Sequence, residues 1–294
     1  MFGFQRTGDQ IWAFGDARGR GFLMGATAGR TTLAGEGLQH DDGHTHVLAS
    51  TVPNVRGYDP AFAYELATIV RDGIERMYGA KPEDVFYYVT LHNENYAQPV
   101  RPEGVTDADI LRGMYRFAAA PDLGKDAHPA RLVGSGSILN QVLAARELLA
   151  ERFGVAAEIY SAPSFPLLRR EALEAERWNR LHPDAKDPRV PVVSRILTAQ
   201  PGGGPIVAAT DWMKALPDMV SRWIPTPYIA LGTDGFGRSG TREDLRALFE
   251  IDPPHIAAAT MAALARCGSV TPKAAAKAIR DLGIDPEKAD PLAL

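Results

Sequence analysis

Histidines and carboxylates gather in one short stretch of this chain, residues 35–46, with the sequence GEGLQHDDGHTH. Three of the seven histidines and two aspartates lie there: His40, Asp41, Asp42, His44 and His46. Glycines on either side let the backbone turn sharply and approach a ligand closely. Imidazoles beside carboxylates can bind substrates or exchange protons near neutral pH. Because a packed core needs none of these groups, the stretch is predicted to form part of a site.

Two chemistries fit this stretch. The alternating pair His44 and His46, with His40 and Asp42, resembles the ligand sets of some metal-dependent hydrolases. Few imidazoles lie elsewhere to complete such a set, and these are His92, His128, His182 and His255. A site that binds substrate or handles protons is therefore favoured over a metal site, and a solvated polar loop is the remaining interpretation.

Two glycine-rich turns also follow predicted strands, at residues 134–137 and 232–239. The first lacks the third glycine of a dinucleotide fingerprint and the Lys-Ser/Thr pair of a P-loop. It is interpreted as a tight turn with Ser137 as a helix N-cap. The second turn, and the polar stretch 92–96, could line a cleft at the carboxyl edge of a sheet.

Composition excludes several classes of protein. The 294 residues are 45% hydrophobic and 23% charged, with a net charge of −4, which argues against a nucleic-acid or anionic-membrane surface. No apolar run of about 18 residues and no secretory signal is found, so a cytoplasmic location without a membrane anchor is expected. The single cysteine, Cys267, is expected to be a buried structural thiol in a reducing compartment.

The apolar patterns indicate an α/β fold. In the first 100 residues they predict strands at 21–26, 47–55 and 85–91, and a helix over 59–79 that is capped by Asp59. A Pro- and Gly-rich stretch with a short helix near 107–115 follows as a domain boundary. The second half begins with a βαβ unit. Its expected strands are at 155–161, 205–209 and 228–232, with a strand and turn at 130–137. Its expected helices are at 138–153, 171–181, 214–223, 256–265 and 272–282, and a further helix begins at Thr241.

The chain resembles the homodimeric bacterial pyruvate dehydrogenase E1 component, a transketolase-like enzyme that depends on thiamine diphosphate. The residues that carry the resemblance span nearly the whole chain: 1–6, 29–33, 35–40, 58–60, 93–96, 176–179, 181–183 and 231–239. The resemblance implies that the chain is the C-terminal portion of that enzyme. Residues 1–100 would be the C-terminal part of the pyrimidine-binding middle domain, 101–126 a linker, and 127–294 a transketolase C-terminal-like domain.

The resemblance also implies the activity and the site. The full enzyme decarboxylates pyruvate oxidatively and reductively acetylates the lipoyl group of the E2 dihydrolipoyl acetyltransferase, using thiamine diphosphate and Mg²⁺. His40 would contact the cofactor-bound substrate, Asp42 and His46 would bind substrate oxygens, and Phe2 would lie near the aminopyrimidine. Neither the metal ligands nor the glutamate that activates the cofactor falls in the matched region, so the isolated chain is expected to be inactive. Two alternatives remain: a non-catalytic dimerisation module, or the metal-dependent hydrolase described above.

Overall fold

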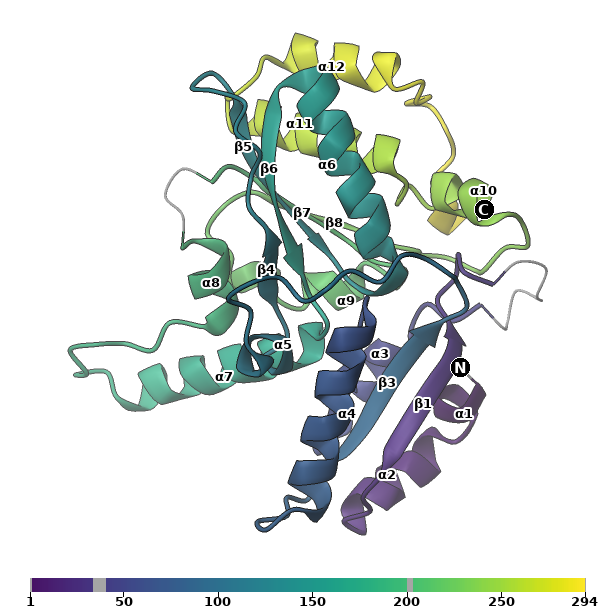
Figure 1. Cartoon of the computed structure of the whole chain (residues 1–294), viewed down its shortest axis with the longest axis vertical. Coiled ribbons are helices and arrows are strands. Elements are labelled where there is room, and N and C mark those ends of the chain that lie inside the picture. Colours follow the sequence, from purple (N-terminus) through teal and green to yellow (C-terminus); the bar gives the residue numbers. More distant parts are fainter. Residues whose placement is uncertain (1, 34–40, 200–202, 294) are drawn as a thin grey trace.

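The protein folds into two α/β halves, each built on its own sheet (Figure 1). The structure, a computed structural model, describes residues 2–33, 41–199 and 203–293, with the side chains of residues 2 and 3 left out. The first sheet is parallel, in the order β1-β3-β2, and the second has the order β4-β6-β5-β7-β8. Only β4 is antiparallel to its neighbour in the second sheet. The strands are β1 (Phe22–Ala28), β2 (Val55–Tyr58), β3 (Phe86–His92), β4 (Tyr115–Ala118), β5 (His128–Gly134), β6 (Val155–Ser161), β7 (Ile206–Ala209) and β8 (Tyr228–Leu231).

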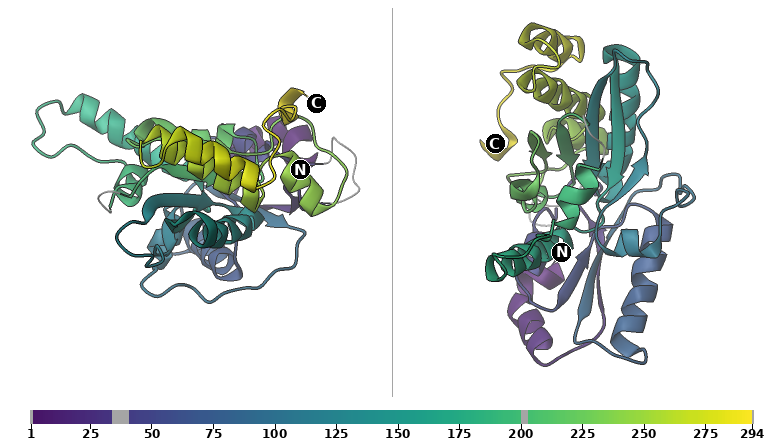
Figure 2. Two further views of the ribbon diagram at one scale, coloured as in Figure 1. Left: turned by 90° about the horizontal axis from the view of Figure 1, so that it is seen from above. Right: turned by 90° about the vertical axis from the view of Figure 1, so that its left-hand side faces the viewer.

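Helices cover both faces of each sheet. In the first half, Phe86 and Tyr88 of β3 pack toward α2, whereas Tyr87 and Val89 pack toward α4 on the opposite side (Figure 2). This alternation places a continuous apolar strand between two helical layers. The helices of this half are α1 (Phe2–Arg6), α2 (Gly8–Asp16), α3 (Thr45–Ala49), α4 (Ala63–Tyr78) and α5 (Asp107–Leu111).

The second sheet is layered in the same way. Leu132, Ile159 and Val207 pack with α6, α11 and α12, while Val133 and Tyr160 pack with α7, α8 and α9 on the other face. The β5-α6-β6 crossover joins two parallel strands, which confirms the predicted βαβ unit. The helices of this half are η1 (Gly136–Ile138), α6 (Leu139–Phe153), α7 (Phe165–Leu181), α8 (Val192–Leu197), α9 (Ala215–Asp218), η2 (Ser221–Trp223), α10 (Arg242–Leu248), α11 (Pro253–Arg266), α12 (Pro272–Asp281) and η3 (Pro291–Ala293).

Several local predictions were wrong. The strand expected at 47–55 is the helix α3 followed by the short strand β2. Asp59 does not cap a helix, since α4 begins only after Phe62, and Ser137 lies inside η1 rather than at an N-cap. Cys267, expected to be buried, is exposed just after α11. Asp59 is instead held by side-chain donors from both halves of the chain, and Cys267 lies at the exposed C-terminal end of α11.

The stretch 101–126, expected to be a linker, carries regular structure. The short helix α5 lies there, and β4 follows it and pairs with β6 at the edge of the second sheet. Among the described residues, no helix is long and apolar enough to cross a membrane.

The carboxyl ends of the strands of the two halves face each other (Figure 1). Asp59 follows β2 and His92 ends β3, and they meet Ser135 after β5 and Trp212 after β7. Loops at the carboxyl ends of parallel strands are where open α/β folds place their ligands. Here part of that edge is filled by the other half of the same chain, so the polar groups of one half bind those of the other.

Candidate functional site

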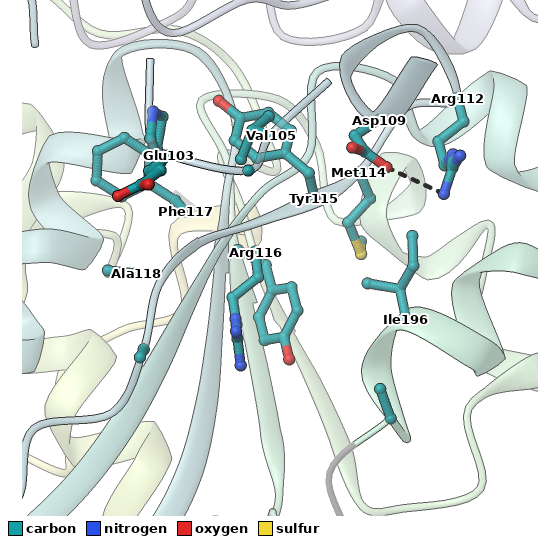
Figure 3. Close-up of a pocket in the computed structure, with 15 residues that line it drawn as sticks. Glu103, Val105, Asp109, Arg112, Met114, Tyr115, Arg116, Phe117, Ala118 and Ile196 are labelled. Atoms are coloured by element: carbon teal, nitrogen blue, oxygen red, sulfur yellow. Dashed lines mark ion pairs between the residues drawn. The ribbon is translucent and has the colours of Figure 1, made fainter. Parts of the chain in front are cut away.

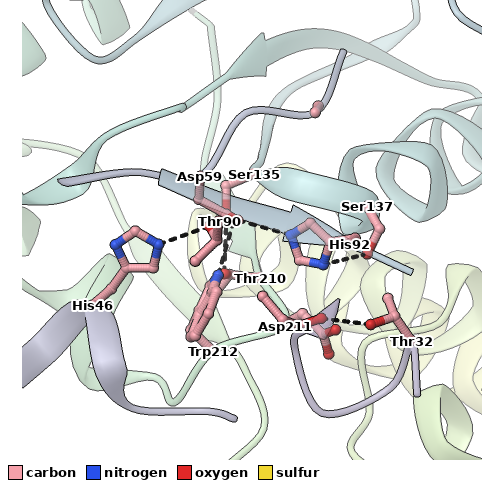
Figure 4. A network of polar contacts seen from close by, with 12 residues as sticks. Thr32, His46, Asp59, Thr90, His92, Ser135, Ser137, Thr210, Asp211 and Trp212 are labelled. Carbon is pink, nitrogen blue, oxygen red and sulfur yellow. Dashed lines mark hydrogen bonds and ion pairs between the residues drawn. The ribbon is translucent and has the colours of Figure 1, made fainter. Parts of the chain in front are cut away.

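Asp59 is the centre of a buried polar network between the two halves (Figure 4). Thr90 Oγ1, at 2.7 Å, and His92 Nε2, at 2.8 Å, donate hydrogen bonds to its Oδ1. Ser135 Oγ and Trp212 Nε1, both at 2.8 Å, donate to its Oδ2. Two of the four donors come from each half of the chain. The carboxylate is therefore fully hydrogen-bonded without solvent and ties the halves together.

Asp59 and His92 each stabilise the charged form of the other. Burial alone would raise the pKa of Asp59, but the adjacent His92 and the hydrogen bonds hold it well below its usual range. Burial alone would lower the pKa of His92, yet Asp59, followed by Asp211 and Glu94, raises it. On its other side, the His92 ring lies 3.5 Å from Ser137 Oγ. The pair is consequently an ion pair inside the protein.

His46, predicted to bind substrate, lies in this network. It is 1% exposed, and its Nε2 is 2.9 Å from Thr90 Oγ1, which in turn donates to Asp59. The imidazole meets the Trp212 ring edge-on at 4.6 Å and lies 5.0 Å from the Tyr88 ring. Burial lowers the pKa of His46, so the ring is neutral. The structure thus places His46 in the interior of the described part of the chain.

Asp42, also predicted to bind substrate, holds the start of α3. Its Oδ1 accepts the backbone N–H groups of His44 and Thr45, both at 3.1 Å, and its Oδ2 accepts the Thr45 hydroxyl. Thr45 Oγ1 also lies 2.6 Å from Tyr88 OH. This arrangement, typical of Asp in a turn, fixes the backbone that carries His44. The Asp42 carboxylate is fully buried.

The remaining predicted residues are only partly described. His40 lies outside the described residues, immediately before Asp41. Phe2 is the first residue of α1, and its side chain is also outside the description. The described residues Gln5, three positions after Phe2 in α1, and Asp41, the residue after His40, both line one cavity.

This cavity, here called the junction cavity, has a volume of about 480 Å³ and is formed by both halves of the chain. The first half contributes residues from α1, from the end of β1 and from the segment before α3, and the second half contributes a turn after β8. The lining residues are Gln5, Arg30, Asp41, His44, Gly235, Phe236 and Gly237. The half-buried His44 imidazole forms no hydrogen bond with the described residues. Of the two described histidines of the cluster, His44 and His46, it is therefore the one better placed to meet a ligand.

Arg30 fastens the glycine-rich turn to the first half. Its Nη1 donates to the carbonyl oxygens of Thr233 and Gly235, 203 and 205 residues further along the chain. Burial lowers the pKa of Arg30, and the carboxylates of Asp42 and Asp211 oppose that shift. The predicted placement of residues 232–239 at a cleft is thus confirmed for the part that lines the junction cavity.

Two arginines of α10 hold the segment that leads into the histidine cluster. Arg246 forms a two-pronged ion pair with Glu94 and donates to Thr31 Oγ1 at 3.3 Å. Arg242 donates to the carbonyl oxygen of Thr32 at 3.1 Å. These contacts could not be predicted from the sequence, because an arginine on a short helix gives no signal of its distant partner.

The metal-ligand interpretation gains no support from the geometry. Both oxygens of Asp42 are used within its own loop, and His46 is turned toward Thr90 in the interior. Within the described ranges, no group of three or more His, Cys, Asp or Glu side chains could hold a metal ion.

Another cavity, of about 540 Å³, opens beside β4 (Figure 3). Its two arginines are already paired, Arg112 with Asp109 at 3.1 Å and Arg116 with Glu158 at 3.2 Å. A ligand site usually presents a few convergent polar groups that remain available. The junction cavity, which also borders the histidine cluster, is the better candidate.

Comparison with solved structures defines the class of fold. A mutant transketolase from Pichia stipitis superposes with a TM-score of 0.60 at 18% identity, covering 98% of this chain and 34% of that one. A transketolase from Leishmania mexicana gives a TM-score of 0.58 at 14% identity, covering 82% and 30%. A split-gene transketolase, described as an inactive beta4 tetramer, gives 0.52 at 17% identity, covering 83% and 66%. The fold is therefore transketolase-like.

Sequence comparison then gives the family. The pyruvate dehydrogenase E1 component middle domain matches residues 1–99, and the transketolase-like TK C-terminal domain matches residues 113–252. The pyruvate dehydrogenase E1 component of Pseudomonas aeruginosa is 51% identical over 295 residues, covering 99% of this chain and 32% of the relative. That of Escherichia coli K12 is 48% identical over 293 residues, with the same coverages. The chain belongs to the pyruvate dehydrogenase E1 component family and spans about a third of the length of these relatives.

Proposed function

We propose that this chain forms the substrate-facing wall of the thiamine-diphosphate site in a pyruvate dehydrogenase E1 component. The complete enzyme would decarboxylate pyruvate oxidatively and acetylate the lipoyl group of an E2 acetyltransferase, acting as a cytoplasmic homodimer. The observation that carries the proposal is the junction cavity, where both halves of the chain meet beside the histidine cluster. In domain terms, residues 1–100 would belong to the middle domain, 101–126 to a connection and 127–294 to the C-terminal domain.

The described residues fit one side of the cofactor. α1 lies at the junction cavity through Gln5, and Asp41, the residue that follows His40 in the sequence, lines the same cavity. The cofactor would supply the electron sink for decarboxylation. We assign Mg²⁺ and the diphosphate to other residues of the complete enzyme, because the described part of this chain offers no cluster of metal ligands.

The chain's own residues would bind and orient the substrate. His40 is proposed to hydrogen-bond the oxygens of pyruvate, where it would stabilise developing negative charge. Asp42 and His46 are proposed to hold the substrate-binding residues in place without touching the substrate themselves. Asp42 fixes the turn that carries His44, and His46 packs between Trp212 and Tyr88 beneath that turn. Buried supports of this kind hold the groups that touch a ligand in one geometry.

A chimera tests the proposal. The chain would replace the matching segment of the Pseudomonas aeruginosa relative, which is 51% identical over 295 residues. Pyruvate-dependent reduction of a dye is expected in the chimera. His40→Ala should lower turnover by one to several orders of magnitude, roughly the effect of losing a group that stabilises transition-state charge. His182→Ala, at an exposed position after α7, is the matched control and should leave turnover unchanged.

The test has clear contrary results. A chimera that folds and binds thiamine diphosphate but does not turn over pyruvate would contradict the proposal, as would normal turnover in His40→Ala. For the 294-residue chain alone, calorimetry is expected to show no binding of thiamine diphosphate with Mg²⁺. Light scattering on the same sample would show whether it self-associates, as the dimerisation alternative requires.

A further inference from the structure

Phe236 is unusually exposed for an aromatic residue at a cavity. Its side chain is 72% exposed, and it packs in none of the described hydrophobic clusters. It nevertheless lines the junction cavity together with Gly235 and Gly237. A single exposed apolar side chain is ordinary on a protein surface. Phe236 differs because its exposed ring lines a cavity formed by both halves of the chain, where it can contact a bound ligand.

The backbone beneath this ring is held firmly. Arg30 binds the carbonyl oxygens of Thr233 and Gly235, and the Thr233 N–H donates to the Trp212 carbonyl at 2.9 Å. Gly237 lies so close to Asp41 that a Cβ there would collide with the Asp41 side chain. On this fixed backbone the ring has only two side-chain torsions to restrict when it binds a ligand, so the entropy cost of binding is small for the apolar area it offers.

The cavity is too large for a three-carbon keto acid alone. Its volume of about 480 Å³ is within the range of pockets that bind drug-sized molecules. Its polar groups, among them Gln5 and His44, come from the first half, whereas the second half contributes an aromatic ring between two glycines. Besides the cofactor proposed above, a ligand that reaches the second half of the cavity should present an apolar portion to the ring.

We propose that Phe236 binds the lipoyl arm, the second substrate of the reaction proposed above, and thereby selects that acceptor. This inference rests on the proposed function. The arm is an uncharged hydrocarbon chain that ends in a dithiolane. Hydrocarbon gains free energy when it covers an exposed ring, and sulfur makes favourable contacts with aromatic edges. The C-terminal half would then contribute directly to acceptor binding through one side chain, in addition to stabilising the fold.

Binding of oxidised lipoamide to the 294-residue chain, followed by ligand-observed NMR, tests the proposal without catalysis. Phe236→Ala should weaken binding about tenfold, which corresponds to about 1.4 kcal/mol of lost contact. Phe236→Leu should weaken it less, because the leucine retains apolar area. Val100→Ala removes a side chain that is 88% exposed and does not line the junction cavity, and it should leave the affinity unchanged.

The chimera separates this inference from the proposed function. There, Phe236→Ala should raise KM for lipoamide at least several-fold more than KM for pyruvate, whereas Val100→Ala should change neither. Equal changes in both KM values would overturn the role of Phe236, as would unchanged lipoamide binding and an unchanged KM for lipoamide. If the chimera still turns over pyruvate, the proposed function would stand. Conversely, the chain could bind lipoamide through Phe236 while the chimera fails to turn over pyruvate. That result would support the lipoamide subsite and contradict the proposed function.

Discussion

Asp59 and Trp212, 153 residues apart, are joined by a 2.8 Å hydrogen bond from the indole Nε1 to the carboxylate Oδ2. The bond crosses the junction between the two sheets, and His46 packs edge-on against the same indole. Trp212 therefore joins His46 of the histidine cluster and the Asp59–His92 ion pair in one buried network. The stability of the junction and the geometry of the site should therefore change together.

Asp59→Asn should destabilise the protein strongly. The substitution leaves His92 buried without its counter-charge and replaces one acceptor oxygen by an NH₂ group. In either orientation of the amide, this NH₂ group faces two of the four hydrogen-bond donors of Asp59. Breaking a buried ion pair by removing one partner costs about 3–5 kcal/mol. Urea unfolding followed by circular dichroism measures the loss. Asp107→Asn, which breaks exposed ion pairs with Arg71 and Arg101, is the control and should shift the midpoint little. A similar small shift for both variants would show that the Asp59 network does not stabilise the junction.

Gly136→Ala should be far more damaging than Gly154→Ala. Both glycines have a positive φ, +50° and +63°, where alanine costs about 1–2 kcal/mol. A Cβ at Gly136 would also lie 2.6 Å from Asp59 Oδ2 and closer still to His92 Nε2, whereas one at Gly154 meets nothing within 4 Å. We expect a loss of about 2–5 kcal/mol for the first variant and about 1 kcal/mol for the second. Equal losses by thermal or urea unfolding would contradict the close packing described here.

Asp211 should make the stability of the protein depend on pH. Burial raises the pKa of this carboxyl to about 6, against the opposing influence of His92 and Arg246 and the hydrogen bonds from Thr31. Between about pH 4 and pH 6 the folded state retains a proton that the unfolded state has lost. The free energy of unfolding should therefore fall as the pH rises through this window, by about 3 kcal/mol from this group.

Asp211→Asn isolates that contribution. The amide cannot ionise, so the difference in stability between the variant and the parent protein should grow in favour of the variant from about pH 4 to pH 6. Glu65, whose pKa is also raised by burial, remains in both proteins and cancels in the comparison. Parallel pH profiles of the two proteins would show that Asp211 does not retain its proton in the folded state.

Arg246→Lys should loosen the segment that precedes the histidine cluster. A lysine cannot reproduce the two-pronged pair with Glu94 and the additional bond to Thr31. Loss of a charge-assisted hydrogen bond costs about 1.5–3 kcal/mol, so exchange of the Thr31 amide hydrogen should accelerate about tenfold or more. Hydrogen exchange measured by NMR gives the rate. Arg266→Lys, at the end of α11, is the control, and equal exchange in both variants would contradict the role of Arg246.

The family and the α/β class could be predicted from the sequence because they depend on local or contiguous features. Residues 85–91 form an apolar run typical of a strand buried on both faces, and β3 is that strand. Gly154 ends α6 as expected, since its left-handed conformation is a property of the glycine itself. The histidine cluster was also recognisable from its composition, although the structure buries Asp42 and His46 in the interior.

The surroundings of individual site residues were decided by tertiary structure. Asp59 resembles a helix cap in the sequence, but donors from Thr90, Ser135 and Trp212 make it the buried centre of the junction. His46 lies two positions from His44, yet the former is buried against Trp212 and the latter lines the junction cavity. The sequence determines which groups are available for chemistry. Their burial, their charge and the cavity they face depend on contacts made across the two halves, and local sequence does not encode those contacts.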